Sequence, residues 1–494
     1  MSNQLLTPSR TAVLGLILTA IVQHSIFEGA FYLDADDWFI IDMGRQVVES
    51  HTADQWFRFW SAEPTWRPLL TARSALEFIF FGTDPAPRLL VNLFIHVLCG
   101  WLVFTLTRQW FKSSDAALWA ALLYAAHPLH AEALTWFHSG FEGITVTFFM
   151  LLTLWSFCSQ KATFVSLICF QLALFTRENA LCIPLLVGAV AWGRALNKRD
   201  VKTWIVEAVP FLGLTLLNIG FRLWLIETAE HPPEGSFHFT NSLVTSVTTT
   251  FLHPWIPVHP AIASRTIFWG FWAGSLGALL ILQVRQPKRY AWTAFIGFAL
   301  AASAFIPNFY DSWRFLAALP GGYEQRWYFF HFPLAFLCLW PSQLIVHRFS
   351  ARPAIGRSLL GLLLALSLVT WTNNALWYRQ QSEYVLTTYE TVDEVLKTTP
   401  ATIGITTHEG LDSSELADQV FLNMPMIWPD AAQKGAAAYR QRIEGPQSSL
   451  GVSIRDVRGQ VRWAPTDRIP KHTVWWTWDT TTNTLRRSIP STAN

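Results

Sequence analysis

Long apolar runs separated by short polar turns dominate the first 377 residues of the chain. A helix needs about 20 mostly apolar residues to cross the hydrocarbon core of a bilayer. Runs of about this length predict eleven membrane-spanning helices, centred near residues 11–30, 87–107, 115–130, 141–158, 162–176, 180–193, 204–225, 265–284, 290–307, 327–346 and 358–377. The pattern therefore predicts an α-helical polytopic membrane protein.

Two regions depart from this pattern. Residues 243–262 are apolar but contain three prolines, so we interpret them as a re-entrant or interfacial element and not as a span. After residue 377 the apolar runs stop, and an amphipathic helix is expected over 378–398. Short strand-like runs follow, such as 451–454 and 474–478, separated by turn residues. This region predicts a small α+β domain.

The distribution of charge supports the same division. Residues 378–494 carry 25 charged side chains in 117 positions, whereas the first 377 residues carry only 45. We therefore expect a transmembrane region over 1–377 and a soluble domain over 378–494. A net charge of +2 gives no strong attraction for nucleic acid. All five cysteines lie in apolar segments, which argues against a disulfide framework or a cysteine metal site.

The loop charges predict an orientation, because lysine and arginine collect in cytoplasmic loops. With the N-terminus in the cytoplasm, basic residues such as Arg108, Lys161 and Arg285 fall in cytoplasmic loops, and the opposite loops are rich in acids. Eleven spans then place residues 378–494 outside the cytoplasm, in the periplasm if the protein belongs to a bacterial inner membrane.

The first outer loop, residues 31–86, begins with three carboxylates in four positions: Asp34, Asp36 and Asp37. One interpretation is a helix cap, because aspartate is favoured where a helix starts. The other is a functional acid, since carboxylates at a membrane boundary are costly unless they are used or paired. The same loop supplies Arg67, a candidate for binding an anionic group.

The second outer loop contains His127, His130 and Glu132. Two histidines near a glutamate suggest a metal site, but Pro128 interrupts the helix that would place both imidazoles on one face, and the order differs from H-E-x-x-H. We therefore favour hydrogen bonding to a polar substrate, or packing against the first outer loop, over metal binding.

Further arginines occur on the predicted outer side, where the charge rule disfavours them. Arg177 follows an apolar run, and its alternative role is a local ion pair with Glu178. Arg326 precedes the tenth span and Arg222 ends the seventh, and both could serve as interfacial anchors. Guanidinium groups bind phosphate through two parallel hydrogen bonds, so an anionic ligand would explain the cluster.

The order of these motifs resembles a known family. An acidic group after the first helix is followed by W-R-P-L, N-L-F-I-H, H-P-L-H-A-E-A-L-T-W, T-R-E-N-A and Y-E-Q-R-W-Y. This is similar to the GT-C superfamily of membrane glycosyltransferases, and within it to protein O-mannosyltransferases with tetratricopeptide repeats. The resemblance covers about residues 11–377. Residues 378–494 show no 34-residue repeat, which departs from those enzymes.

The resemblance implies a sugar transfer, with inversion, from a polyprenyl-phosphate donor to a protein, lipid or glycan acceptor on the non-cytoplasmic face. It implies Asp36 as general base, with Asp37 and then Asp34 as alternatives. Arg67, Arg177 and Arg326 would bind the donor phosphate, and His127, His130 and Glu132 would form a supporting polar wall. No cofactor is required, although a divalent metal is compatible. The alternative function is a secondary transporter or a lipid or glycan flippase.

Overall fold

The structure is a computed structural model of the chain, and it describes a defined subset of the residues. These are 8–27, 35–50, 66–159, 163–198, 201–228 and 331–398, together with five strands between 403 and 487. The spans expected at 265–284 and 290–307, the element at 243–262, and two candidate site residues, Asp34 and Arg326, lie outside the described residues.

The described residues before position 399 are almost entirely helical. In chain order the helices are α1 (Pro8–Phe27), α2 (Ala35–Ser50), α3 (Pro68–Phe81), α4 (Pro85–Phe111), α5 (Ser114–Ala125), α6 (His130–Thr135), α7 (Phe137–Cys158), α8 (Thr163–Thr176), the 3₁₀ helix η2 (Glu178–Cys182), α9 (Ile183–Lys198), α10 (Val201–Thr228), α14 (His331–Arg348) and α15 (Pro353–Thr398).

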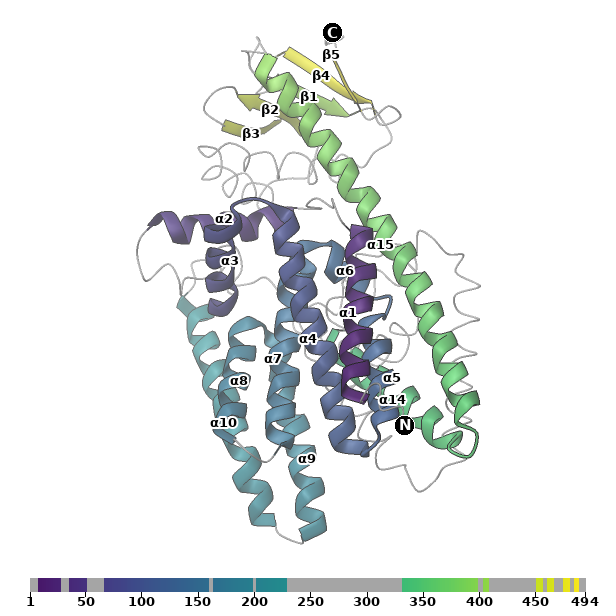
Figure 1. Ribbon diagram of the computed structural model, residues 1–494. Coiled ribbons are helices and arrows are strands. Elements are labelled where there is room, and N and C mark those ends of the chain that lie inside the picture. Colours follow the sequence, from purple (N-terminus) through teal and green to yellow (C-terminus); the bar gives the residue numbers. More distant parts are fainter. Residues whose placement is uncertain are drawn as a thin grey trace. The chain divides into compact units, whose positions relative to one another are not determined.

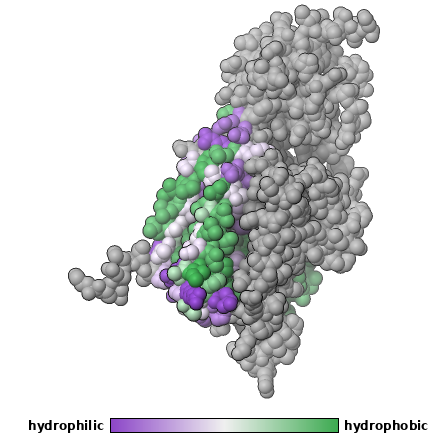
Figure 2. All heavy atoms as spheres, turned by 90° about the vertical axis from the view of Figure 1, so that its right-hand side faces the viewer, coloured by the Kyte–Doolittle hydropathy of each residue, from purple (hydrophilic) through white to green (hydrophobic). Residues whose placement is uncertain are grey.

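Five of the described helices are long and apolar enough to cross a membrane: α1, α4, α7, α10 and α15. Large apolar side chains on three of them point outward, as in Leu18 of α1, Leu217 of α10 and Val369 of α15. Figure 2 shows one face of the molecule, where hydrophobic side chains form a band with hydrophilic residues at its ends. The chain is therefore an α-helical integral membrane protein, as the apolar runs predict.

The helices of the first compact unit pack both against neighbours in sequence and against helices that are distant in sequence. This unit includes α1, α4 to α10, α14 and α15 as far as Tyr378. The pairs α7 with α8, α9 with α10, and α5 with both α1 and α14 are in extensive contact, and Figure 1 shows the near-parallel arrangement of α7 with α8 and of α9 with α10. Small residues in α5, such as Ala117 and Ala121, pack against Ala12 and Leu16 of α1. Small side chains let helices in a membrane approach closely.

The span expected at 115–130 is interrupted. Helix α5 begins with Ser113, whose hydroxyl accepts a hydrogen bond from the amide of Ala116 at 3.2 Å, and it ends at Ala125. A helix of 12 residues is about 18 Å long, which is too short to cross the hydrocarbon core alone. Pro128 explains the break, because the residue before a proline is disfavoured in a helix.

The short helix α6 and the start of α7 form a tight turn around Gly140. A Cβ added to Gly140 would lie 2.0 Å from the carbonyl oxygen of Ala133 and 2.4 Å from the Nδ2 atom of Asn92. Asn92, on α4, is buried and donates to the carbonyl oxygen of Phe137 at 3.3 Å. The absence of a side chain at position 140 therefore allows α6, α7 and α4 to meet.

The second compact unit contains α2, α3 from Thr71 onward, the end of α15 and the strands. Gly44 of α2 lies against Ser74 of α3, because a Cβ at Gly44 would meet the backbone of Ser74 at 2.5 Å. The hydroxyl of Ser74 donates to the carbonyl oxygen of Ile40. Gly82 ends α3 with a positive φ of 58°, the conformation that glycine adopts most easily after a helix.

The strands form one five-stranded sheet in the order β3-β2-β1-β4-β5. They are β1 (Ile403–Thr407), β2 (Leu450–Arg455), β3 (Gln460–Pro465), β4 (Val474–Asp479) and β5 (Thr484–Arg487). Strands β1 and β4 are parallel, with Gly404 opposite Trp475, and the other pairs are antiparallel. Helix α15 runs without a break from 353 to 398, so the span expected at 358–377 and the helix expected at 378–398 are one element. The α+β domain and its boundary at 378 stay predictions.

The close contact at Gly140 gives a testable consequence. We expect Gly140→Ala to lower the free energy of unfolding by about 1–3 kcal/mol, the usual cost of adding a methyl group to a packed interior. The matched control is Gly213→Ala in α10, where an added Cβ meets nothing within 4 Å. That change should stabilise by about 0.5–1 kcal/mol. Thermal unfolding of both variants in detergent measures the difference, and equal melting temperatures would contradict the packing described.

Candidate active site

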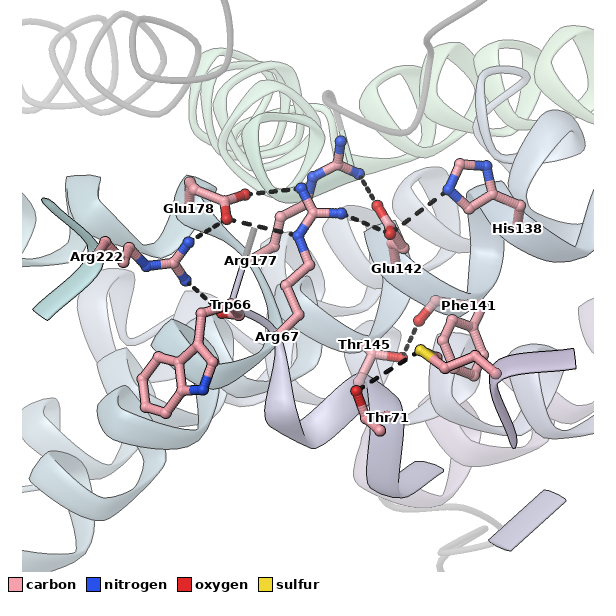
Figure 3. A network of polar contacts seen from close by, with 11 residues as sticks. Trp66, Arg67, Thr71, His138, Phe141, Glu142, Thr145, Arg177, Glu178 and Arg222 are labelled. Carbon is pink, nitrogen blue, oxygen red and sulfur yellow. Dashed lines mark hydrogen bonds and ion pairs between the residues drawn. The ribbon is translucent and has the colours of Figure 1, made fainter. Parts of the chain in front are cut away.

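Five buried or nearly buried charged residues form a continuous network in the first unit. Arg67 precedes α3, Glu142 lies on the first turns of α7, Arg177 and Glu178 join α8 to η2, and Arg222 lies on α10. Figure 3 shows that their side chains converge from these four segments. We call this set the Arg–Glu network.

Charges of opposite sign alternate along the network. Arg177 contacts Glu142 at 2.7 Å, and Glu142 also accepts from Arg67 at 2.7 Å. Arg67 then donates through Nη2 to Glu178 at 3.0 Å, and Glu178 accepts from Arg222. The order is therefore Arg177, Glu142, Arg67, Glu178, Arg222. A carboxylate that is removed from water is costly unless it is paired, and each carboxylate here contacts two guanidinium groups.

Arg222 is held by four acceptors. Besides Glu178, it donates to Oδ1 of Asn218 at 2.8 Å, one turn earlier in α10, and to the carbonyl oxygens of Trp66 and Leu174 at 3.0 and 2.9 Å. Its side chain is 10% exposed. The interpretation of Arg222 as an interfacial anchor is therefore wrong, because an anchor keeps its guanidinium in contact with water and lipid headgroups.

Aromatic contacts of Trp66 hold the segment that carries Arg67. The indole ring of Trp66 lies between Phe175 of α8 and Phe221 of α10, with ring centroids 4.9 and 4.6 Å away and edge-to-face geometry. Such pairs add to the stability gained from apolar burial. The segment Trp66–Arg67 is thus fixed to the helix bundle by both apolar and charged contacts.

The structure brings two of the three predicted phosphate-binding arginines together. Arg67 and Arg177 share the carboxylate of Glu142, and Nε2 of His138 lies 3.5 Å from the same carboxylate. Arg177 therefore pairs with a residue on another helix, Glu142 of α7, whereas the sequence suggests a local pair with Glu178.

A second buried polar group surrounds His130. Its Nδ1 atom lies 2.5 Å from Nδ1 of His331 on α14, and the two rings stack with centroids 4.6 Å apart. His96 of α4 packs edge-on at 4.4 Å and contacts the carbonyl oxygen of Ala125 at 3.0 Å. All three imidazoles of this group are buried.

The remaining two residues of the predicted polar wall have different surroundings. Glu132 is buried and accepts from the hydroxyls of Ser139 at 2.8 Å and Tyr378 at 3.2 Å. His127 is half-buried, and its Nδ1 atom accepts from the amide of Leu129 at 3.3 Å. Within the part of the chain that the structure describes, no three His, Cys, Asp or Glu side chains are placed to hold a metal ion.

The acidic group after α1 lies at the start of α2. This helix begins at Ala35, so Asp36 and Asp37 occupy its first turn. Asp37 is fully buried, whereas the side chain of Asp36 and all of Asp34 lie outside the described residues. Carboxylates in the first turn interact favourably with the helix dipole, so the cap interpretation agrees with the start of α2, and the role as general base stays a prediction.

Sequence reasoning did not assign a role to Glu142, and it did not select His96, His331 or Tyr378. Glu142 carried a usable signal, because a carboxylate inside an apolar span is expensive and usually functional. His331 and Tyr378 carried none of this kind, since their neighbours at His130 and Glu132 are more than 200 residues away in sequence.

Short segments of two curated proteins match the chain. Protein O-mannosyl-transferase Tmtc1 of Drosophila melanogaster is 38% identical over 69 residues, and protein O-mannosyl-transferase tmtc2 of Xenopus laevis is 38% identical over 71 residues. The chain resembles protein O-mannosyltransferases. Each match covers 14% of this chain and only 8% of the relative, and no protein-family model matches the chain.

Solved structures also show a distant similarity to the chain. ArnT from Cupriavidus metallidurans, bound to undecaprenyl phosphate, has a TM-score of 0.46 at 14% identity, covering 87% of this chain and 88% of that one. The apo oligosaccharyltransferase of Archaeoglobus fulgidus has a TM-score of 0.42 at 14% identity, covering 78% of this chain and 59% of that one. Both structural similarities are weak.

The network predicts a large stability effect at Arg222. Removing one partner of a buried ion pair typically costs about 3–5 kcal/mol, because the other charge is left uncompensated. We expect Arg222→Met to destabilise by this amount, since it leaves Glu178 with one guanidinium fewer.

The matched control is Arg357→Met, which removes an arginine–carboxylate pair, 2.7 Å to Asp115, between side chains that are 59% and 45% exposed. Exposed pairs contribute about 0–1 kcal/mol. Thermal unfolding in detergent compares the two variants. A loss at Arg222 no larger than at Arg357 would show that the network does not hold the bundle together.

Proposed function

We propose that this protein is a GT-C membrane glycosyltransferase that moves a sugar from a polyprenyl-phosphate donor to an acceptor hydroxyl or amine. The observation that carries the proposal is the Arg–Glu network, which gathers three guanidinium groups and two carboxylates at one place in an apolar helix bundle. A local excess of buried positive charge suits an anionic ligand. The short similarity to protein O-mannosyltransferases supports the same class.

In the proposed reaction, Asp36 takes the proton from the acceptor as general base, with Asp37 and then Asp34 as alternatives. The acceptor atom attacks the anomeric carbon on the face opposite the phosphate, and the bond from that carbon to the phosphate oxygen breaks with inversion. The leaving phosphate keeps the electron pair. Arginines that are already oriented stabilise the charge that develops on it.

Three arginines are assigned to the donor phosphate in this proposal: Arg67, Arg177 and Arg326. His127, His130 and Glu132 line the polar side of the site. No cofactor is required for the chemistry, and a divalent metal bridging acid and phosphate is compatible with it. The acceptor is a protein, a lipid or a glycan.

We place the reaction on the non-cytoplasmic face, with the N-terminus in the cytoplasm of a bacterium and residues 378–494 in the periplasm. This orientation follows from the loop charges, since the basic residues near the span ends collect on the opposite side.

The general base is tested with Asp36→Asn. This change removes the proton acceptor but keeps the size of the side chain, so we expect sugar transfer to fall by at least about 10²-fold, within the usual range for general-base catalysis. Purified protein in detergent is incubated with polyprenyl-phosphate sugars, and transfer or hydrolysis is measured. The control is Asp115→Asn, at an exposed ion pair. Transfer by Asp36→Asn at the wild-type rate would remove Asp36 from this role.

The same assay separates the enzyme from a transporter or flippase, because detergent abolishes any gradient and a transporter would consume no donor.

The phosphate role is tested with Arg326→Ala, which should raise the KM for the donor about tenfold with a smaller change in kcat, since a binding contact is lost. An unchanged KM would leave Arg326 as an interfacial anchor.

A further inference from the structure

Several exposed basic residues of the first unit lie outside the Arg–Glu network. They occupy the start of α1, the end of α4 with the turn that follows it, and the turn between α14 and α15 with the helix ends on both sides of it. All of them are exposed. We call this set the basic rim: Arg10, Arg108, Lys112, Arg348, Arg352 and Arg357.

Two side-chain contacts bring these segments together. Nη1 of Arg108 donates to the hydroxyl of Ser9 at 3.3 Å, so the end of α4 lies beside the start of α1. Nη2 of Arg357 contacts Asp115 at 2.7 Å, so the start of α15 lies beside the start of α5. A short turn joins α4 to α5, and another joins α14 to α15. The segments therefore meet at one end of the helix bundle, where Figure 1 marks the N-terminus.

This end of the bundle carries far more positive than negative charge. The described segments 8–14, 104–118 and 345–360 contain six arginines and lysines but one acid, Asp115. Asp115 is paired with Arg357. The three segments therefore have a surplus of five positive charges. Exposed charge of one sign attracts ligands of the opposite sign.

The backbone at Lys112 gives a second, independent observation. Lys112 ends α4, and its φ angle is 54°, in the left-handed region that glycine adopts most easily after a helix. Folding alone would therefore favour glycine at this position. A strained backbone that is retained often marks a functional residue. A positive charge is the property that lysine supplies here and glycine does not.

Apolar side chains that face outward adjoin the basic rim. On α15, Ile355 and Leu359 lie on either side of Arg357 in sequence, and they are 43% and 39% exposed. On α1, Val13 follows Arg10 by three residues and is 43% exposed. Both helices are long and apolar enough to cross a membrane, and the hydrophobic band in Figure 2 ends in hydrophilic side chains. A phospholipid has the same order of parts, with apolar chains next to a polar headgroup.

We propose that the basic rim binds the headgroup phosphate of an anionic phospholipid, whose acyl chains lie along the apolar faces of α1 and α15. Guanidinium groups bind phosphate oxygens through paired hydrogen bonds, and the ammonium group of Lys112 adds a compact charge. The occupant is a membrane lipid and not a soluble anion, because the cations border outward-facing apolar surfaces. The proposal is independent of sugar transfer and of the side of the membrane on which the rim lies.

The charge of the rim is tested with Lys112→Asn and Arg352→Gln. Asparagine adopts a positive φ more readily than most residues, so the turn after α4 should be kept while its charge is lost. Native mass spectrometry of the protein in neutral detergent, titrated with phosphatidylglycerol, measures the Kd of the first bound lipid. We expect each variant to raise this Kd about fivefold, the contribution of one basic residue near an anionic surface. A Kd of the double variant equal to that of the wild type would overturn the proposal.

The matched control is Arg379→Gln, which removes an arginine from a pair with Glu383 in the same helix. Arg379 is separated from Arg357 by about 33 Å of helix, more than three Debye lengths at about 0.1 M salt. We therefore expect the Kd for phosphatidylglycerol to stay at the wild-type value. A rise as large as that in Lys112→Asn would mean that total charge governs binding, and the proposal would fail.

Lys112→Gly separates lipid binding from folding. Glycine adopts the observed φ without steric strain, so the melting temperature in detergent should not fall, whereas the Kd for phosphatidylglycerol should rise about fivefold because the charge is lost. A lower melting temperature with an unchanged Kd would give Lys112 a purely structural role and remove it from the rim.

Two further titrations identify the source of the phosphate. Phosphatidylcholine with the same acyl chains should bind at least about tenfold more weakly than phosphatidylglycerol, because it has no net charge. Inorganic phosphate in excess should not displace phosphatidylglycerol. Equal binding of the two lipids, or displacement by inorganic phosphate, would contradict a site for an anionic lipid. No sugar donor is present in these titrations, so a failure of the proposed transferase activity would leave their outcome unchanged.

Discussion

Charge compensation inside an apolar bundle is the constraint on which the rest of this structure depends. Two carboxylates, Glu142 and Glu178, lie among helices that otherwise pack through alanine, leucine and phenylalanine side chains. Neither could remain ionised there without guanidinium partners. The arginines that supply this compensation come from the segment before α3, the α8–η2 junction and α10, so satisfying two charges also joins segments that are distant in sequence.

The α6–α7 turn connects this network with the second buried polar group. Helix α6 carries His130 and Glu132, and the first turns of α7 carry Ser139 and Glu142. The short α6 exists because Pro128 ends the preceding helix, and the turn closes because residue 140 has no side chain. This break in the helical path thus places four hydrogen-bonding side chains, His130, Glu132, Ser139 and Glu142, on two consecutive helices.

Sequence patterns located the long described helices α1, α4, α7, α10 and α15, because the length of an apolar run follows directly from bilayer thickness. Arg67, Arg177, His130 and Glu132, which the sequence singles out as site residues, lie in buried or nearly buried polar surroundings, and their roles in a site stay predictions. Their partners were not predicted. The contact between His130 and His331 depends on tertiary packing between residues far apart in sequence, as does the pairing of Glu142 with two arginines. Apolar periodicity contains no information on such pairs.

The observed pairing of the arginines with glutamates and the phosphate binding proposed for them place opposite demands on these side chains. A guanidinium that stabilises the bundle must keep its acceptors, whereas one that binds a ligand must give up an acceptor when the ligand arrives. An electrostatic site works best when its groups need little reorganisation. Most of the charged side chains of the network should therefore keep their positions when a ligand binds. The order of the network is Arg177, Glu142, Arg67, Glu178, Arg222. Arg67 contacts both carboxylates, and Arg222 donates to four acceptors. Arg177 and Arg222 each share their carboxylate with Arg67, so Arg67 is the cation that both carboxylates have in common. The central position of Arg67 therefore makes it the cation on which the pairing of this network depends most.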